Sequence, residues 1–506
     1  MIFRPRLLTV AVALALGPGA GASALALDLH QAYRDSLAND ALVASARSAL
    51  DASRERVTQA QATLLPGINA SAAATRQIVN SNIGPRRDFT TQSYGVNLSF
   101  PLFRLQNIVT VDQSKLQVAV FEAQLEQAMQ DLMIRVSQAY FDVLASQDSL
   151  GTIRSQKRAI TEQLASAKRN FEVGTATITD QQEAQSRYDL TIAQELAGEN
   201  DLAVKLAALT LLTGKPLAEL DVLRGGLTLQ GPQPAREAEW ASSAREHNLA
   251  VQQAQVAIEV AKREIDKQRY GHYPTLDLVS GLNRSTNPSV TLFGFQATTA
   301  SLGLQLNVPL YAGGGVDARV REAVALREKS SNDLENARRQ AEQGARTAFL
   351  GVNSGLGQVK ALEAAEKSSQ LALDSNLLGY QVGVRINIDV LNAQQQLYTT
   401  RRDLAKARYD VLVNGLRLKQ TAGTLQEDDL QAVNGLLTAR PPDPPASAAA
   451  PPASPPSSGT GTGTAGTGSE AKPAAAMIPG SARPRIRGGR LMRPTAPPTV
   501  TPAPSR

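Results

Sequence analysis

A stretch of sequence that occurs twice constrains this chain more than any other feature. FEVGTATITDQQEAQ at residues 171–185 returns as YQVGVRINIDVLNAQ at residues 380–394, with the Val-Gly pair, the acid and the final Ala-Gln in register. Upstream, YGVNLSFPLF at 94–103 matches LGLQLNVPLY at 302–311 at nearly the same offset. Two copies of one unit therefore make up the chain. A unit this long must be a substantial assembly rather than a short solenoid module.

Each copy contains a stretch of more than 110 residues without proline, from Leu102 to Lys215 and from Leu310 to Arg440. These stretches are rich in Ala, Gln, Leu, Glu and Arg, which favours helices because proline breaks them. Apolar and small residues recur every three or four positions, as in a seam between packed helices. The sequence predicts a long and a returning helix in each copy, at 106–170 and 179–213, then at 315–378 and 388–423.

The repeated Val-Gly pair lies between the long and the returning helix of each copy. Glycine tolerates the left-handed conformation that commonly ends a helix, so Gly174 and Gly383 are suited to a reversal of the chain. A helix over 106–170 would be about 100 Å long at 1.5 Å per residue. Such a rod needs neighbours along its whole length.

Before each long helix the apolar pattern changes to a period of two. Tyr94, Val96 and Leu98 alternate with Gly95 and Asn97, and the second copy repeats this alternation. We expect β-hairpins at 67–102 and 275–310, with the strand length and dyad pattern of outer-membrane barrels. A half-buried sheet covered by helices would show the same alternation and is the alternative. Aromatic residues near the strand ends fit an interfacial belt: Phe89, Tyr94, Phe103, Phe293, Phe295 and Tyr311.

Four strands cannot close a barrel, and an open edge in lipid leaves backbone groups unpaired at several kcal/mol each. Closure must come from other copies of the chain. Two copies would give about eight strands and three about twelve, and the larger barrel leaves an aqueous lumen. Hydrogen-bond satisfaction therefore predicts a homo-oligomer.

Both ends of the chain differ from its body. Residues 1–26 carry two arginines, an apolar run and a small-residue site ending Ala24-Leu25-Ala26, as in a secretory signal peptide. Residues 440–506 hold 16 of the 27 prolines and six net positive charges, and few large apolar groups, so we expect a disordered tail. The first copy then occupies 27–235 and the second 236–439.

Several functional classes lack support in the sequence. The body carries about two net negative charges once the tail and leader are set aside, so it offers no basic domain for nucleic acid. The chain has no Cys, and His30, His247 and His272 lie far apart without ligand spacing, so no metal or other cofactor is predicted. We see no nucleophile with a His partner, and an enzyme is the weakest hypothesis.

Over residues 28–438 the sequence resembles the TolC family of outer-membrane channel-tunnels. The resemblance is carried by the paired turns, the LLP and HYP strand entries, the NLSFPLF and LNVPLYAGG strand ends, and AGTLQEDDL. It implies a homotrimer that is mainly α-helical, in which a 12-stranded outer-membrane barrel continues into a long periplasmic helical barrel with an equatorial domain. The partners implied are a periplasmic adaptor and an inner-membrane transporter, either an ABC exporter or a proton-driven pump.

The resemblance also assigns roles to the paired turns at the periplasmic end. Tyr380 and Arg385 resemble residues that tie the inner coil to Thr179 and Asp180 and hold the mouth shut. Asp389 resembles an acid whose three copies ring the constriction and attract cations. At Asn392 the family archetype has a second acid, so weaker block by divalent cations is expected. The grooves that receive the adaptor would be at two Val-Gly pairs: Val173, Gly174, Val382 and Gly383.

Two functions compete on this reading. The first is an outer-membrane exit duct of a tripartite efflux or type I secretion system, gated at its periplasmic end. The second is a periplasmic coiled-coil tether or adaptor that never enters the membrane. Without the resemblance, the charged residues at the turns would be read as exposed pairs or helix caps worth about 1 kcal/mol or less.

Overall fold

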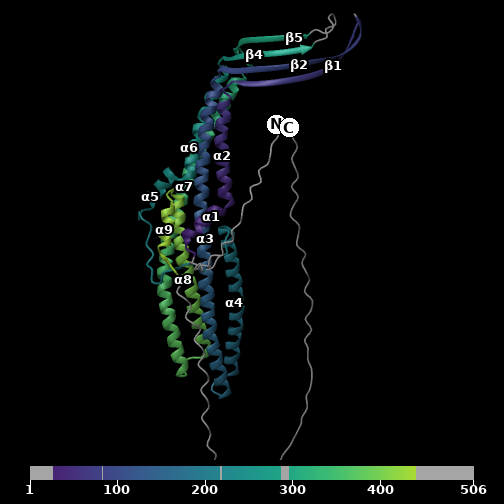
Figure 1. Ribbon diagram of the computed structural model, residues 1–506. Coiled ribbons are helices and arrows are strands. Elements are labelled where there is room, and N and C mark those ends of the chain that lie inside the picture. The colour runs from purple at the N-terminus through teal and green to yellow at the C-terminus, as the bar shows by residue number, and fades with distance from the viewer. Residues whose placement is uncertain (1–26, 83, 217–218, 287–295, 440–506) are drawn as a thin grey trace, which may run out of the picture. The chain divides into compact units, whose positions relative to one another are not determined.

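The computed structural model describes residues 27–82, 84–216, 219–286 and 296–439, which are mainly helical (Figure 1). Contacts divide the chain into residues 1–442 and 443–506, and the described residues all belong to the first unit. The expected signal peptide and disordered tail lie outside the described residues, as do Phe293 and Phe295.

The two copies repeat one order of elements, namely a helix pair, a strand pair, a long helix and a returning helix. The first copy comprises α1 (Leu29–Asn39), α2 (Ala41–Ala62), β1 (Gly67–Ser81), β2 (Gly84–Phe103), α3 (Leu105–Glu172) and α4 (Ile178–Thr213). The second comprises α5 (Glu237–His247), α6 (Leu249–Arg269), the short helix η1 (Tyr270–His272), β4 (Thr275–Thr286), β5 (Gln296–Asn307), α7 (Gly315–Gln381) and α8 (Asn387–Thr421). Three small elements complete the fold: β3 (Val222–Leu223), α9 (Glu427–Asn434) and β6 (Leu437–Thr438).

These bounds agree closely with the predicted elements. The long helices begin within a residue of the expected positions and run two or three residues further, to Glu172 and Gln381. Their length follows from the proline-free sequence, and each ends two residues before the glycine that was expected to reverse the chain. No helix among the described residues combines the length and the apolarity needed to cross a membrane.

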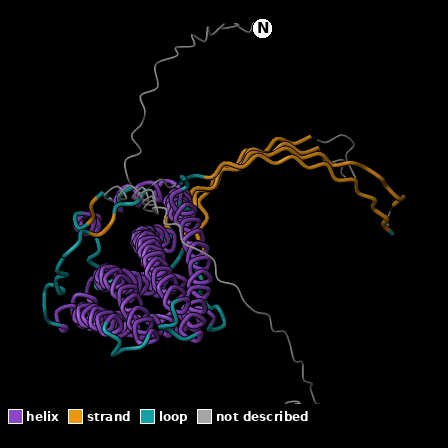
Figure 2. Tube along the Cα trace, turned by 90° about the horizontal axis from the view of Figure 1, so that it is seen from below, coloured by secondary structure: helices purple, strands orange, loops and turns teal. Residues whose placement is uncertain are grey.

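The four long strands form one antiparallel sheet in the order β1-β2-β4-β5, which Figure 2 shows as a single curved layer. Val96 of β2 pairs with Ala70 of β1 on one side and with Leu282 of β4 on the other. The expected alternation therefore gathers apolar side chains on one face, where Leu302 and Leu304 of β5 are 76% and 66% exposed. A sheet covered by helices would have buried them, so that alternative is not what the chain forms.

The helices pack on one another rather than on the sheet. The long helix α3 packs against α2, α4, α6 and α8, and α7 packs against α5, α6 and α8 (Figures 1 and 2). The largest core cluster lies midway along α3, where Phe141 stacks on Tyr409 of α8 at 5.6 Å between ring centroids. Side chains from α1, α4, α9 and β6 complete this cluster. The core therefore joins both copies at the level of the small elements.

An ion pair joins the two copies where the sheet meets the helices. Arg104, directly before α3, donates from Nε and Nη2 to the two carboxylate oxygens of Asp277 in β4, at 2.9 and 2.6 Å. The Asp277 side chain is only 11% exposed. A two-pronged pair of this kind fixes direction as well as distance. It therefore positions the start of the long helix relative to the second hairpin.

Candidate functional site

The first turn links α3 to α4 and closes on four backbone hydrogen bonds, one of which runs from Gly174 N to Phe171 O at 3.0 Å. Val173 N donates to Arg169 O at 3.1 Å, and the amides of Thr175 and Ala176 donate to Asn170 O at 2.8 and 3.1 Å. Gly174 adopts a φ of +79°, which glycine reaches without strain. The otherwise unpaired carbonyls at the end of α3 thereby find donors.

The second turn, between α7 and α8, repeats this pattern atom for atom. Val382 N donates to Leu378 O at 3.1 Å, and the amides of Val384 and Arg385 donate to Gly379 O at 2.9 and 3.1 Å. Gly383 has a φ of +80°. The repeated sequence thus specifies one backbone scaffold that is used twice.

The side chains on the two scaffolds differ at a pair of positions that are in contact. The first turn has Asn170 and Ala176 where the second has Gly379 and Arg385. A Cβ added to Gly379 would lie 2.6 Å from Arg385 Cγ. The arginine stem therefore occupies the space that a side chain at position 379 would need.

The helices that leave the turns also begin differently. At the start of α4, Thr177 Oγ1 accepts from Asp180 N at 3.2 Å, and Asp180 Oδ2 accepts from Thr177 N at 3.0 Å, which makes a capping box. In α8 the equivalent of Thr177 is Ile386, which cannot cap with its side chain. Asp389, the equivalent of Asp180, instead lies 3.6 Å from Arg385 Nη1.

A buried amide ties the second turn to the first copy. Asn387 is 1% exposed at the start of α8; its Nδ2 donates to Asp180 O at 3.2 Å and its Oδ1 accepts from Gln163 Nε2 of α3 at 2.5 Å. Beside it, Asn170 Nδ2 donates to Tyr380 Oη at 3.2 Å. Three hydrogen bonds thus connect the turn regions of two hairpins that are far apart in the sequence.

The structure brings only some of the expected gate residues together within one chain. Tyr380 contacts Asn170, and Arg385 contacts Asp389, whereas the exposed Thr179 lies outside both contacts. The expected bonds from Tyr380 and Arg385 to Thr179 and Asp180 are therefore not the contacts that one chain makes. The gating role of these residues stays a prediction.

Asn392 is a further polar residue near the turns, in addition to Asn387, Gln163 and Asn170. Asn392 Oδ1 accepts from Arg187 Nη2 of α4 at 3.0 Å, so this position adds a link between the copies rather than a charge. Sequence reasoning missed Asn387, Gln163 and Asn170. The available signal was the asymmetry of the repeat, because Asn387 stands where the first copy has Ile178.

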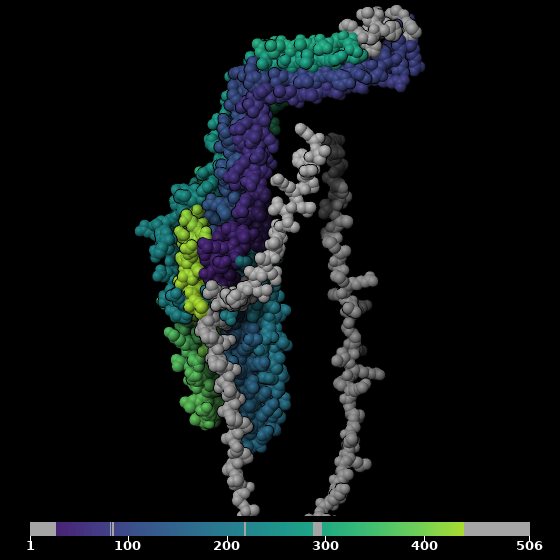
Figure 3. All heavy atoms as spheres, viewed as in Figure 1, coloured from purple at the N-terminus to yellow at the C-terminus, as the bar shows by residue number. Residues whose placement is uncertain are grey.

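Apolar side chains are exposed at both turns. Val173 is 72% exposed, and Val382 and Val384 are 64% and 76% exposed. In the space-filling view the turns lie at the lower ends of the teal α3–α4 and green α7–α8 hairpins (Figure 3). Clustered apolar residues at a surface commonly mark a contact with another molecule.

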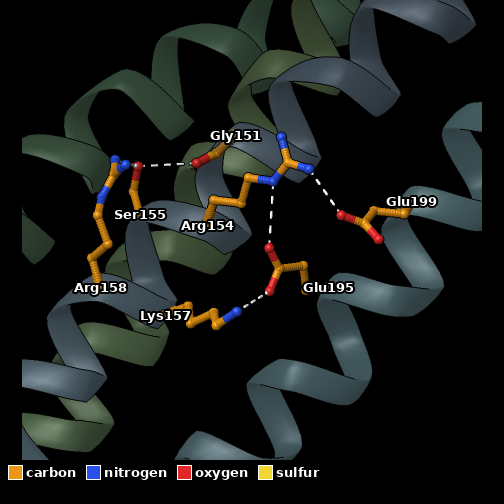
Figure 4. A network of polar contacts seen from close by, with 7 residues as sticks. All are labelled: Gly151, Arg154, Ser155, Lys157, Arg158, Glu195 and Glu199. Atoms are coloured by element: carbon orange, nitrogen blue, oxygen red, sulfur yellow. Dashed lines mark hydrogen bonds and ion pairs between the residues drawn. The ribbon is translucent and has the colours of Figure 1, made fainter. Parts of the chain in front are cut away.

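Above the first turn, ion pairs join α3 to α4 (Figure 4). Arg154 Nη2 lies 2.8 Å from Glu199 Oε1, and Lys157 Nζ lies 2.6 Å from Glu195 Oε2. The hydrogen bond from Lys157, together with its charge and that of Arg154, holds the pKa of Glu195 below its usual value although desolvation opposes this.

The second hairpin carries the same kind of link with the charges exchanged. Here the long helix supplies the acids, and Arg408 Nη2 lies 2.7 Å from Glu363 Oε1 while Arg401 Nε lies 3.0 Å from Glu366 Oε1. Glu363 and Arg408 are the repeat equivalents of Arg154 and Glu199. Among the described residues no cluster of three or more His, Cys, Asp or Glu side chains could hold a metal ion.

The chain is similar in sequence and in fold to known outer-membrane proteins. The outer membrane protein TolC of Vibrio cholerae is 32% identical over 417 residues, covering 82% of this chain and 94% of that protein. The proteases secretion protein PrtF of Dickeya chrysanthemi is 31% identical over 431 residues, covering 82% and 92%. The solved outer membrane protein VceC of Vibrio cholerae superposes with a TM-score of 0.66 at 17% identity, covering 78% of this chain and 96% of that one, which shows a shared fold.

The fold is thus that of outer-membrane channel proteins. The profile of the family described as outer membrane efflux protein matches residues 32–215 and 240–424, and the chain belongs to this family. The protein is an outer-membrane exit duct of the efflux and type I secretion kind that extends into the periplasm. Membership of the family rules against the alternative of a tether that stays out of the membrane.

Proposed function

We propose that the paired turns are the periplasmic gate of a homotrimeric, passive exit duct. The observation that carries the proposal is the buried tie of Asn387 to Gln163 and to the Asp180 carbonyl, because it couples the position of α8 to the first copy. For the gate to open, the hydrogen bonds of Asn387 must break, or Gln163 and Asp180 must move together with α8. The proposed gate comprises Tyr380, Arg385, Thr179, Asp180, Asp389 and Asn392.

The energy for transport and the signal to open come from partners. The exposed Val173 and Val382 support the proposal that the Val-Gly tips, Val173-Gly174 and Val382-Gly383, receive the hairpin of a periplasmic adaptor. An inner-membrane ABC or proton-driven transporter supplies the energy, and the duct itself catalyses no reaction. The name of one relative refers to protease secretion and the family description to efflux, so the cargo class is a secreted polypeptide or a small toxic compound.

Charge at the constriction sets ion preference. Three copies of Asp389 would form a ring that attracts cations, and Arg385 offsets each carboxylate at 3.6 Å. Asn392 adds no charge to this ring, and its carbonyl oxygen is occupied by Arg187. Asn392→Asp should therefore strengthen block of the channel by divalent cations, measured as the cation concentration that halves conductance in planar bilayers.

Arg385→Ser tests the gate directly. Removing the arginine frees Asp389 and vacates the space beside Gly379, so single-channel conductance in planar bilayers should rise and cation selectivity should increase. Arg339→Ser is the matched control, because Arg339 is an exposed arginine of α7 whose partner among the described residues is Glu335 of the same helix. Equal conductance of the two variants would contradict the proposed gate.

A further inference from the structure

Residue 27 is held in place by both backbone and side-chain hydrogen bonds. Leu27 N donates to Glu219 O at 2.7 Å, and Asp221 N donates to Leu27 O at 3.3 Å, so residue 27 forms a parallel bridge to Leu220. The hydroxyl of the fully buried Tyr140 lies 3.0 Å from Leu27 O and 2.9 Å from Asp221 O. The chain is thus anchored in the largest core cluster from its first described residue.

Two acids adjoin this anchor point, since Asp28 follows Leu27 and Asp221 donates its amide to Leu27 O, and neither has an ion pair among the described residues. Asp28 caps α1 through Gln31 N at 2.6 Å and accepts from Asn434 Nδ2 at 3.1 Å, both neutral donors. The Asp221 carboxylate has neither a hydrogen bond nor an ion pair among the described residues. Partial burial, and then the charge of Asp28, raise the pKa of Asp221. A partly buried carboxylate without a partner is costly, and a cation beside Asp221 would stabilise its charged form.

Neither Tyr140 nor His30 supplies that cation. Burial and the charges of Asp221 and Asp28 raise the pKa of the Tyr140 hydroxyl, so it stays neutral. His30 of α1 lies 2.8 Å from Glu427 of α9 and is directed to that acid. The missing charge must therefore come from another source.

We propose that the leader is cut between Ala26 and Leu27 and that the new α-ammonium group of Leu27 fills this acidic socket of Asp28 and Asp221. In the cut, water adds across the Ala26–Leu27 amide, which leaves the carboxylate on Ala26 and the ammonium on Leu27. The ammonium keeps the hydrogen bond to Glu219 O that the amide makes and supplies the charge that the amide lacks. Small residues at 24 and 26 suit a signal peptidase. The precursor cannot make this ion pair, so removal of the leader adds the last interaction at this edge of the core.

The pH dependence of this ion pair follows from the direction in which the pKa of the Leu27 α-amino group is shifted. An α-amino group has a pKa of about 7.7–8.0 when free, and two adjacent carboxylates raise it in the folded state. The resulting stabilisation is fully present below the unfolded pKa and is lost as the pH rises through the folded pKa. Thermal stability of the mature trimer should therefore fall above about pH 8, and Asp221→Asn should reduce that fall.

Amine labelling of the exported protein tests the proposal. The protein purified from outer membranes should begin at Leu27 by mass spectrometry. An amine reacts with an N-hydroxysuccinimide ester only when deprotonated, so at pH 7.5 each unit of raised pKa slows labelling about tenfold. Asp221→Asn should therefore speed labelling of the Leu27 amine about tenfold, measured against lysine peptides of the same molecule.

Glu219→Gln is the matched control, because it removes an exposed carboxylate two residues away and keeps the carbonyl that accepts from Leu27. If Asp221→Asn does not assemble, Asp28→Asn replaces it, since asparagine also caps helices well. It should likewise speed labelling. A mature chain that begins at another residue would overturn the proposal, as would equal labelling rates in the Asp variant and the control.

Discussion

The two turns share a backbone and differ in what their side chains do. The first is closed on itself, because Thr177 and Asp180 satisfy one another in a capping box. The second leaves its helix without a side-chain cap, carries Arg385 in space that Gly379 leaves free, and uses Asn387 to reach the other hairpin. Duplication thus preserved the reversal of the chain, while a few substitutions gave one turn the contacts between copies.

The helices above the turns show a second contrast between the copies. Arg154 and Glu199 of the first hairpin are replaced by Glu363 and Arg408 at the equivalent positions of the second. Because α8 also packs against α3, the exchange bears on the register of such mixed pairs. In the register of the two hairpins, Arg408 of α8 would meet Arg154 of α3, and Glu199 of α4 would meet Glu363 of α7. Like charges repel, so the exchange favours the observed pairing over the mixed one.

The largest expected effect comes from replacing Asn387 of the second turn with the residue at the equivalent position of the first turn. Asn387→Ile matches Ile178 and leaves the Gln163 amide and the Asp180 carbonyl without their partner. Each buried group left unsatisfied costs about 1–3 kcal/mol, so the closed form should weaken and open probability in planar bilayers should rise.

The control for this change is Asn376→Ala, which removes a half-buried asparagine of α7 whose amide, among the described residues, bonds to Ala372 O of its own helix. If the Asn387→Ile protein assembles fully and its channel stays closed, the hydrogen bonds of Asn387 do not keep the periplasmic end closed.

A smaller effect is expected from restoring a side chain at Gly379. Gly379→Ala places a Cβ 2.6 Å from Arg385 Cγ, so the arginine must move, at a cost of about 1 kcal/mol. Adding Arg385→Ala, which recreates the Ala176 of the first turn, should relieve this cost. Thermal melting of the trimer measures both proteins, and strictly additive losses would contradict a direct contact between the two positions.

Reversing the charge of one residue in the α3–α4 link should have a still weaker effect. Arg154→Glu sets a second acid opposite Glu199, and because both side chains are about half exposed the loss is at most about 1 kcal/mol. The double variant with Glu199→Arg copies the polarity of the second hairpin and should recover part of the lost stability in thermal melts at low salt, because Glu195, which lies 3.4 Å from Arg154, remains acidic. Failure of the exchange to restore stability would argue against charge as the basis of pairing.

The smallest effect concerns acid pH. Because the folded pKa of Glu195 is lowered, chiefly by Lys157, its contribution to stability is present above the usual carboxyl pKa of 4.5 and is lost as the pH falls through the lower folded value. Glu195→Gln should flatten the decline of melting temperature below about pH 4.5. Glu328→Gln, on an exposed acid of α7, provides the comparison and should keep the decline.

Local patterns predicted the elements because their causes are local. The proline-free stretches, the period of three to four and the Gly174 and Gly383 stops located the helices to within a few residues. The tie at Asn387 could not be found in this way, because its partners lie 224 and 207 positions away. The contact of Arg385 with Gly379 depends on the backbone geometry of the turn, which a comparison of the two repeated sequences does not reveal. Sequence reasoning therefore located the turns but not which atoms join them.

The sheet has consequences for inheritance as well as for structure. Each outer strand, β1 and β5, has one partner in the described chain, so each sheet meets its neighbours through two edges. A chain with one damaged edge can still enter a ring through the other and leave that ring unsealed. If such a chain is made in equal amount with the normal one, random assembly leaves only about one in eight trimers wholly normal. Lesions in β1 or β5 should therefore behave as dominant alleles, whereas losses of the whole chain should be recessive.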